Sequence, residues 1–382
     1  MKLKISFVFL LFAFNLLFSE TVYHGCAITP SGYFYLVEKE SSKVYASWDT
    51  GRTWQDLGRP NMTERWLYDI FFLNDTLGWI AAEGGFIFHT RDGGFSWRPQ
   101  NQGGTKFAQR VFMLDERFGW VASGEAIILR TTNGGEEWEQ VILPNPPFPG
   151  DTVDFYGVYF IDSLTGWAVA GRYPVGDTFI KGQGYIAKTI DGGLNWSLLR
   201  KDTIYDFFDC HFANENEGWV VGGNDRTLEP CILHTTDGGE NWEIQNPPTG
   251  YYLRAVHFIG QEGWASGMFG TILYTPNGRN WTSQVTGVPG TIFDIEFLNS
   301  EIGIASGTDF ALWTIDGGRN WHMTNVGIKV RQKADSKIRD WGVSGEIIYD
   351  ATGRKVKEMK KKGVYFIRPG RIDKSIKKII LK

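Results

Sequence analysis

Carboxylates at a repeated spacing are the side chains of this sequence best suited to chemistry. Seven Asp or Asn residues each stand two positions after Thr or Ser, and each is followed by Gly and then Trp. The motif occurs at Ser47–Trp54, Thr90–Trp97, Thr131–Trp138, Thr189–Trp196, Thr235–Trp242, Thr275–Trp281 and Thr314–Trp321. Such carboxylates could ligate calcium or act in catalysis. We interpret them as structural, because every copy repeats the same pattern and a repeat protein needs at most one active centre.

The motif predicts a tight turn between two strands. An Asp or Asn oxygen can accept bonds from N–H groups of the turn, Gly permits a positive φ, and the Trp is expected to pack on the neighbouring sheet. The oxygen-bearing residues are Asp49, Asp92, Asn133, Asp191, Asp237, Asn277 and Asp316. The tryptophans are Trp54, Trp97, Trp138, Trp196, Trp242, Trp281 and Trp321.

A second landmark has the same count. A Gly and a large residue open an apolar run ahead of each turn, at Gly32, Gly78, Gly119, Gly166, Gly218, Gly263 and Gly303. Between these landmarks, residues 68–100 divide into four short strands: Tyr68–Leu73 (A), Trp79–Ala82 (B), Phe86–Thr90 (C) and one around Trp97 (D). Four strands in a repeat of about 40 residues are typical of a propeller blade. We predict an all-β, seven-bladed β-propeller over residues 20–327, and we expect a monomer.

The turn motif resembles the Asp-box of BNR repeats. The order of Gly-Trp and then Thr-x-Asp-Gly-Gly-x-x-Trp over the whole body resembles the YCF48-like propellers. Sialidases, sortilin-type receptors and xyloglucan hydrolases also carry Asp-boxes. The resemblance therefore implies a fold and not a reaction.

Both ends of the sequence suggest export. Lys2 and Lys4 precede an apolar run from Ile5 to Phe18, which predicts a signal peptide at residues 1–19. No later stretch is long and apolar enough to span a membrane, so the mature chain is expected to lack a transmembrane segment. We expect passage through the periplasm to a secreted or cell-surface location.

The C-terminal residues 328–382 break the repeat. Gly345–Val356, Lys362–Arg368 and Lys377–Lys382 predict three strands. They resemble the C-terminal sorting domain of the type IX secretion system, in a block with Tyr349, Asp350, Gly353 and Arg354 and a block with Gly363, Tyr365 and Phe366. The resemblance implies a small β-sandwich-like sorting domain that engages the outer-membrane secretion machinery. An ordinary terminal β domain is the alternative.

Charge and cysteine content exclude several classes of function. Residues 20–328 carry 20 Lys and Arg against 37 Asp and Glu, whereas residues 329–382 carry 17 against 6. An acidic body argues against nucleic-acid binding, because phosphate contacts need concentrated positive charge. Cys26, Cys210 and Cys231 are expected to be buried free thiols. The sequence contains no metal-ligand spacing and no phosphate loop, nucleophile elbow or paired-Cys motif, so we predict no cofactor and no metal.

Insertions point to a binding face. Strands alternate in direction, so the B–C and D–A loops share one face, and Leu143–Asp154, Gly171–Gly184 and Gly222–Pro230 enlarge it. Loops on a rigid scaffold are common binding sites, although they could equally be surface decoration. The candidate contacts for a protein or glycan are Phe148, Tyr173, Phe179, Lys181, Arg226, Tyr251 and Tyr252.

Three functions remain open at this point. The first is non-catalytic binding of a protein or glycan through the loop face. The second is glycoside hydrolysis by two carboxylates across the channel, with Asp69, Asp209 and Asp294 as candidates because they occupy equivalent places near the start of strand A. Structural hydrogen bonding is the competing interpretation of these three. The third is an assembly factor like the YCF48 proteins. How the ring closes does not follow from the sequence, because no spare strand is evident.

Overall fold

The computed structural model describes residues 21–60, 64–102, 104–143, 153–171, 184–224, 226–248, 250–324 and 326, and the strands of a C-terminal segment. The chain divides into two compact units, Met1–Ile328 and Lys329–Lys382. The predicted signal peptide lies outside the described residues.

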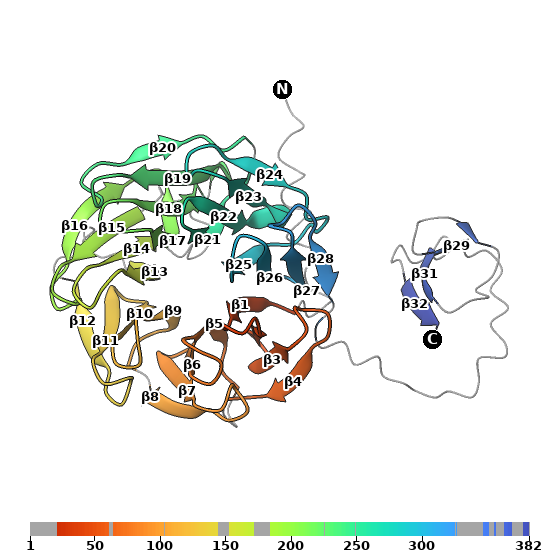
Figure 1. The fold of residues 1–382 in the computed structure, drawn as a ribbon, viewed down its shortest axis with the longest axis horizontal. Helices are drawn as coiled ribbons and strands as arrows, with labels where there is room; N and C mark the ends of the chain where they lie inside the picture. Colours follow the sequence, from red (N-terminus) through yellow and green to blue (C-terminus); the bar gives the residue numbers. More distant parts are fainter. Residues whose placement is uncertain are drawn as a thin grey trace. The chain divides into compact units, whose positions relative to one another are not determined.

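The first unit is a ring of seven four-stranded antiparallel sheets, which confirms the predicted fold and blade number (Figure 1). Blade 1 comprises β1 (Tyr23–Ile28), β2 (Phe34–Glu38), β3 (Lys43–Ser47) and β4 (Gln55–Gly58). Blade 2 comprises β5 (Leu67–Phe72), β6 (Gly78–Ala82), β7 (Phe86–Thr90) and β8 (Arg98–Gln102). Blade 3 comprises β9 (Ala108–Met113), β10 (Gly119–Ser123), β11 (Ile127–Thr131) and β12 (Glu139–Ile142).

The remaining four blades follow the same order. Blade 4 comprises β13 (Asp154–Phe160), β14 (Gly166–Gly171), β15 (Gly184–Thr189) and β16 (Ser197–Asp202). Blade 5 comprises β17 (Asp206–Phe212), β18 (Gly218–Gly223), β19 (Pro230–Thr235) and β20 (Glu243–Gln245). Blade 6 comprises β21 (Leu253–Ile259), β22 (Glu262–Gly267), β23 (Ile272–Thr275) and β24 (Thr282–Gln284), with a short 3-10 turn η1 (Met268–Gly270) between β22 and β23. Blade 7 comprises β25 (Ile292–Phe297), β26 (Ile302–Gly307), β27 (Phe310–Ile315) and β28 (His322–Thr324).

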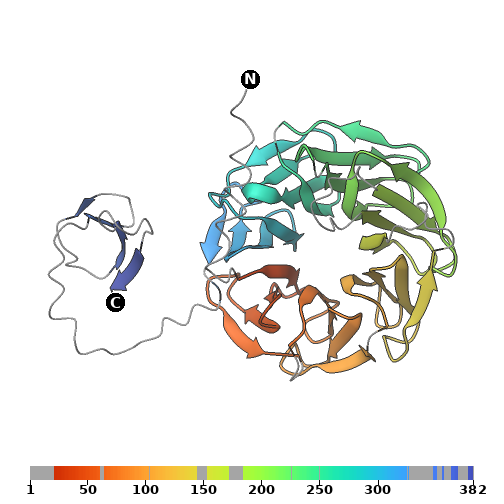
Figure 2. The same cartoon turned by 180° about the vertical axis from the view of Figure 1, so that it is seen from behind.

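Burial falls from the inner strands of each blade to the rim. Every residue of β6, β10, β14 and β18 is buried, whereas β4 and β12 are mostly exposed or half-buried. The strands of each blade are ordered from the centre outward in both views (Figures 1 and 2). The sheets of the two neighbouring blades cover both faces of strand B. Strand B is therefore a continuous apolar run without alternating polar residues. No described helix is long and apolar enough to cross a membrane.

The Asp-box turns hold their own backbone. In blade 4 the Thr189 hydroxyl oxygen accepts the N–H of Gly193 (2.9 Å), and Asp191 Oδ1 accepts the N–H of Asn195 (2.9 Å). Gly193 has a φ of +84°, where a side chain would be strained. The shortened copy in blade 6 differs, because Asn277 Oδ1 accepts the N–H groups of Arg279 and Asn280 instead.

The same turns also join each blade to the preceding one. In all seven interfaces, an Asp-box glycine carbonyl accepts a side-chain donor from the blade before it. The pairs are Tyr35 to Gly93, Gln100 to Gly134, Trp120 to Gly192, Trp167 to Gly238, Trp219 to Gly278, Trp264 to Gly317 and Thr324 to Gly51, at 2.7–3.1 Å. The donor side chain varies in type, but the acceptor is always a glycine carbonyl of the turn. The turn fixes the direction in which this carbonyl points.

Stacking of a strand-B tryptophan accompanies this bond in four consecutive interfaces, and Tyr35 of blade 1 stacks on Phe72 of blade 2 in a fifth. Trp120 of blade 3 stacks on Phe160 of blade 4 with ring centroids 3.4 Å apart, and the Asp-box Trp196 meets the same Phe160 edge-on at 5.9 Å. The equivalent stacks are Trp167–Phe212, Trp219–Phe258 and Trp264–Phe297. Both tryptophan classes therefore lie in the interblade core.

The ring closes without exchanging a strand, because blades 1 and 7 are each built from four consecutive strands. Asp294 Oδ2 of blade 7 accepts the N–H of Cys26 (3.0 Å), and Glu296 Oε2 accepts the N–H of Ile28 (2.8 Å). Asp309 exchanges two bonds with the backbone of Thr21, each of 2.7 Å. Hydrogen bonds from side chains and backbone of blade 7, and not a shared strand, therefore join blade 7 to the N-terminal strand of blade 1 and the residue Thr21 before it. All three cysteines are buried and free, as predicted.

The described part of the second unit is one antiparallel sheet in the order β30-β29-β31-β32. Its strands are β29 (Ile347–Asp350), β30 (Lys355–Val356), β31 (Gly363–Arg368) and β32 (Lys377–Leu381). The first of the three predicted strands is therefore a hairpin of two. A β-sandwich is not shown by the described residues.

Removing an Asp-box hydroxyl is expected to destabilise the propeller. Thr189→Val keeps the side-chain shape but leaves the buried N–H of Gly193 and the partly buried N–H of Asp191 without their acceptor. The expected loss in free energy of unfolding is about 1–3 kcal/mol, measured by denaturant unfolding. Thr203→Val, at an exposed site, is the control and is expected to change it by less than about 0.5 kcal/mol. Equal effects of the two changes would contradict the interpretation.

Candidate functional site

A β-bulge interrupts the innermost strand of every blade at the same place. In each A–B pairing the register skips one residue of strand A, immediately before the equivalent positions Gly25, Asp69, Arg110, Gly157, Asp209, Ala255 and Asp294. The skipped residues are His24, Tyr68, Gln109, Tyr156, Phe208, Arg254 and Phe293. Bulges re-aim side chains and often lie next to functional sites.

All seven bulge residues line one cavity of about 320 Å³, which we call the mouth cavity. Lys39 and Glu83 from B–C turns, and Trp66, Lys106 and Phe107 from D–A loops, complete its wall. The cavity therefore opens on the B–C/D–A face, the face on which the sequence placed its loop insertions. Asp69 and Arg110 form its floor.

Three cations of the mouth cavity, Lys39, Lys106 and Arg254, each lie over an aromatic ring. Lys39 Nζ lies 4.7 Å from the ring centroid of Trp66, Arg254 Cζ lies 4.5 Å from that of Phe208, and Lys106 Nζ lies 5.3 Å from that of Phe107. None of the three cations forms an ion pair with a carboxylate of the described residues.

The positive charges of Lys39, Lys106 and Arg254 are therefore able to bind an anionic ligand. Burial lowers the pKa of Lys39; the negative charge of Glu40 opposes this shift, and the positive charge of Arg254 adds to it. Cation–π contacts orient a cation but do not neutralise it. The mouth cavity is thus a positive, aromatic hollow in an acidic propeller, suited to an anionic group.

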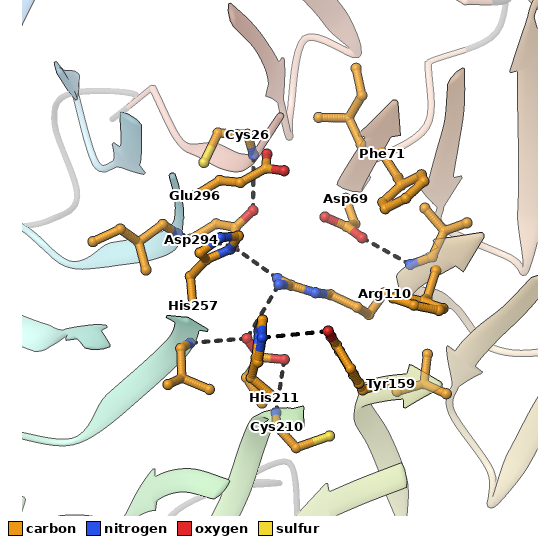
Figure 3. A pocket seen from close by; sticks show the side chains of 17 residues that line it. Cys26, Asp69, Phe71, Arg110, Tyr159, Cys210, His211, His257, Asp294 and Glu296 are labelled. Atoms are coloured by element: carbon orange, nitrogen blue, oxygen red, sulfur yellow. Dashed lines mark hydrogen bonds and ion pairs between the residues drawn. The ribbon is translucent and has the colours of Figure 1, made fainter. Parts of the chain in front are cut away.

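Arg110, like Asp69, lines both the mouth cavity and an inner cavity of about 210 Å³, whose lining side chains are drawn in Figure 3. Its guanidinium bonds Asp294 of blade 7 at 2.8 Å and Asp209 of blade 5 at 3.2 Å. One side chain of blade 3 thereby joins three blades across the axis. The sequence analysis missed Arg110. Aligning the strands on Asp69 and Asp209 would have placed it at the equivalent position.

The structure brings together Asp69, Asp209 and Asp294, the candidate acids of the hydrolase hypothesis, in the lining of the inner cavity with Arg110. Figure 3 labels Asp69, Asp294 and Arg110 in this cavity. Each accepts a backbone N–H of the next blade, from Val111 (2.8 Å), Val256 (3.0 Å) and Cys26 (3.0 Å) respectively. These bonds support the structural interpretation. Catalysis by these carboxylates stays a prediction.

The three carboxyls differ in proton affinity. Burial raises the pKa of Asp69 to about 7 and that of Asp209 to about 6. Burial also raises the pKa of Asp294, but Arg110 and the N–H of Cys26 outweigh burial and lower it.

The equivalent position in blade 1 is Gly25, where a side chain would not fit. A Cβ on Gly25 would lie 2.8 Å from the Cα of Asp69.

The inner cavity holds neutral imidazoles and one further acid. Burial lowers the pKa of His257 to about 4 and that of His211 well below its usual range. The two ring centroids lie 5.4 Å apart across the interface of blades 5 and 6. Burial and the charge of Asp294 raise the pKa of Glu296 to about 8. Across the described residues, no cluster of three His, Cys, Asp or Glu side chains could hold a metal.

The predicted ligand contacts are only partly described. Phe148, Tyr173, Phe179 and Lys181 lie outside the described residues. Arg226 is exposed in the B–C loop of blade 5, and Tyr251 is 45 % exposed. Tyr252 is buried and packs on Phe208 (4.8 Å) beneath Arg254 (5.2 Å), so it supports the mouth cavity from behind. Sequence reasoning missed Lys39, Lys106 and Arg254 because no insertion marks them.

Sequence comparison identifies the family of the propeller. The family model described as "Photosynthesis system II assembly factor YCF48" matches residues 46–204 and 188–322. The chain belongs to the YCF48 family. A curated relative, the "Photosystem II assembly lipoprotein Ycf48" of Synechococcus sp. (strain CC9902), is 30 % identical over 130 residues. This match covers 33 % of the chain and 39 % of that relative.

Solved structures confirm the fold. "YCF48 bound to D1 peptide" has a TM-score of 0.59 at 18 % identity and covers 78 % of this chain and 93 % of that one. YCF48 from Cyanidioschyzon merolae has a TM-score of 0.60 at 17 % identity and covers 78 % and 96 %. Virginiamycin B lyase from Staphylococcus aureus, an enzyme, has a TM-score of 0.56 at 13 % identity and covers 78 % and 93 %. The likeness therefore shows the fold, and any inference about function has to be argued from the residues of the site.

Loss of Arg110 is expected to destabilise the ring strongly at neutral pH. Arg110→Met leaves Asp209 and Asp294 buried without their counter-charge, which typically costs roughly 3–5 kcal/mol. The loss in free energy of unfolding should be smaller at pH 5, because the unpaired carboxyls of Asp209 and Asp294 then take up protons. Unfolding free energies at pH 5 and 8 measure this. Arg91→Met removes an exposed ion pair with Glu136 and should be nearly neutral.

Glu296 is expected to make stability fall as pH rises. Its pKa of about 8 in the folded chain exceeds the ordinary value of 4.5, so the folded state binds the extra proton between these limits. The free energy of unfolding should therefore decrease from about pH 4.5 to 8. Glu296→Gln should flatten this slope and stabilise the protein at pH 9 relative to wild type. An unchanged slope in a thermal-denaturation series would show that Glu296 does not titrate in this window.

Proposed function

We propose that this chain is a non-catalytic protein-binding propeller that holds an anionic segment of a partner polypeptide in its mouth cavity. The observation that carries the proposal is the set of three cations that contact aromatic rings and form no ion pair with a carboxylate in the described part of the chain. In a body with 20 basic and 37 acidic residues, they concentrate positive charge at one hollow of the B–C/D–A face. Such a hollow attracts acidic groups and excludes basic ones.

The comparisons support a polypeptide as the ligand. One structure of the same fold is named as YCF48 bound to a D1 peptide. The family description names an assembly factor. We therefore favour an assembly-type role, in which the propeller holds a segment of another protein, over glycan binding.

We also infer that the protein acts outside the cytoplasm. The apolar segment 1–19 has the pattern of a signal peptide, and a related protein is named a lipoprotein. The C-terminal blocks with Tyr349, Asp350, Gly353 and Arg354, and with Gly363, Tyr365 and Phe366, have the pattern of a type IX sorting domain. Deleting residues 329–382 should leave the protein in the periplasm, and immunoblotting of culture medium, outer membrane and periplasm would reveal its location.

Neutralising the mouth cavity is expected to weaken the binding of an acidic peptide. The variant combines Lys39→Gln, Lys106→Gln and Arg254→Gln, and the probe is a fluorescein-labelled peptide of alternating Asp and Ser. We expect a Kd roughly 10- to 100-fold higher, because charge complementarity is lost. Wild-type binding should also weaken with salt. Fluorescence anisotropy measures both effects.

The matched control neutralises three cations of the opposite face, with Arg52→Gln, Arg91→Gln and Arg319→Gln. These residues lie in the C–D turns of blades 1, 2 and 7. Their loss should leave the Kd within about twofold. Equal weakening by both triple variants would show that only the net charge matters, and the mouth cavity would lose its assigned role.

A further inference from the structure

The B–C turn of blade 6 presents an aromatic ring on a strained backbone. Phe269, in η1, has φ +54° and ψ +39° and is 47 % exposed. A bulky residue in this left-handed region is an outlier, and Gly or Asn would adopt it at lower energy. Backbone demands alone would therefore favour Gly at this position.

Hydrogen bonds on both sides hold the turn in this conformation. Met268 donates its N–H to the carbonyl of Tyr252 (3.0 Å), and Gly270 donates to that of Gly290 (2.7 Å). The Thr286 hydroxyl donates to the carbonyl of Gly270 (2.7 Å). Strained residues persist where the surroundings over-determine them, and such residues cluster at ligand clamps.

A second exposed ring completes the feature. Tyr251 is 45 % exposed, and its ring lies 4.7 Å from that of Phe269 at an angle of 64°. We call this edge-to-face pair of exposed rings the notch. Rigid, exposed aromatic side chains are typical anchors at protein interfaces.

Tyr251 lies three residues before Arg254 in the chain, and Arg254 lines the mouth cavity. The Arg254 guanidinium lies 5.2 Å from the ring of Tyr252, the neighbour of Tyr251 in the chain. Arg254 makes no ion pair with a described carboxylate, and its Nε is buried without a hydrogen-bond partner in the described structure. A ligand that reaches both places therefore needs a carboxylate for Arg254 and an apolar group for the notch.

We propose that the notch between Tyr251 and Phe269 binds an apolar side chain of the same extended acidic polypeptide whose carboxylate binds Arg254. The inference rests on the proposed function and adds a specificity to it. The partner must carry a Leu, Pro or similar side chain within a few residues of Asp or Glu. The ordered turn lowers the entropy lost on binding, because the ring is already in place.

The test selects a phage-displayed random-peptide library against the full chain and its variants. Phe269→Gly removes the ring and relieves the strained backbone, so this variant should melt no lower than wild type. Tyr251→Ser removes the other ring without touching that backbone. Leu228→Gly is the matched control, since Leu228 also has a positive φ (+61°) in a B–C turn of the same face.

Wild type is expected to enrich peptides with an apolar residue close to Asp or Glu. Phe269→Gly and Tyr251→Ser should lose the apolar preference but keep the acidic one, and each should bind a selected peptide roughly 10-fold more weakly. Arg254→Gln should show the reverse pattern. Leu228→Gly should select as wild type does.

Three results would overturn the inference. Acidic peptides without an apolar preference, bound equally by Phe269→Gly, would remove the notch and leave the proposed function standing. Selection of no acidic peptides at all would remove the proposed function as well. Binding of labelled alginate that depends on Phe269 would show that the rings serve a glycan.

Discussion

The propeller depends on one recurring bond, from a side chain of each blade to an Asp-box glycine carbonyl of the next. The Asp or Asn and the Thr or Ser of the motif fold the turn so that this carbonyl points at the preceding blade. Tyr, Gln, Trp and Thr all serve as donors, because only the acceptor must be placed accurately. The motif that invites a catalytic or calcium interpretation thus acts as a joint between blades, and its repetition suits a closed ring.

A second repeated feature, the bulge in strand A, supplies seven of the side chains that line the mouth cavity. It turns one side chain per blade toward the B–C/D–A face, and the next residue forms a layer of small, acidic and basic side chains. Asp69, Asp209 and Asp294 use this layer to bind the following blade, and Arg110 balances two of them. The charges of Asp209, Asp294 and Arg110 are thereby paired within this layer. Lys39, Lys106 and Arg254 have no such pairing with a described carboxylate, so they can bind an anionic ligand.

Some of the site could have been predicted, and some could not. Asp69, Asp209 and Asp294 were recognised as equivalent because they recur at one place in strand A. Arg110 occupies the same place but differs in residue type, so a search for repeated carboxylates passed over it. Lys39 and Lys106 lie in turns of ordinary length, whereas Arg254 is the bulge residue of β21, and none of the three shares a blade with another. Only closure of the ring brings them to one hollow.

The sequence by itself determined the number of blades, the strand order within each blade and the turns between strands, because these depend on contacts local to each repeat. It also indicated which face carries the loops, since that follows from the alternation of strand direction. Ring closure through Asp294 and Glu296, and the convergence of cations and rings at the mouth cavity, were decided by the tertiary structure. These features join residues from different blades, up to 268 positions apart, whose spacing in the chain carries no trace of their proximity.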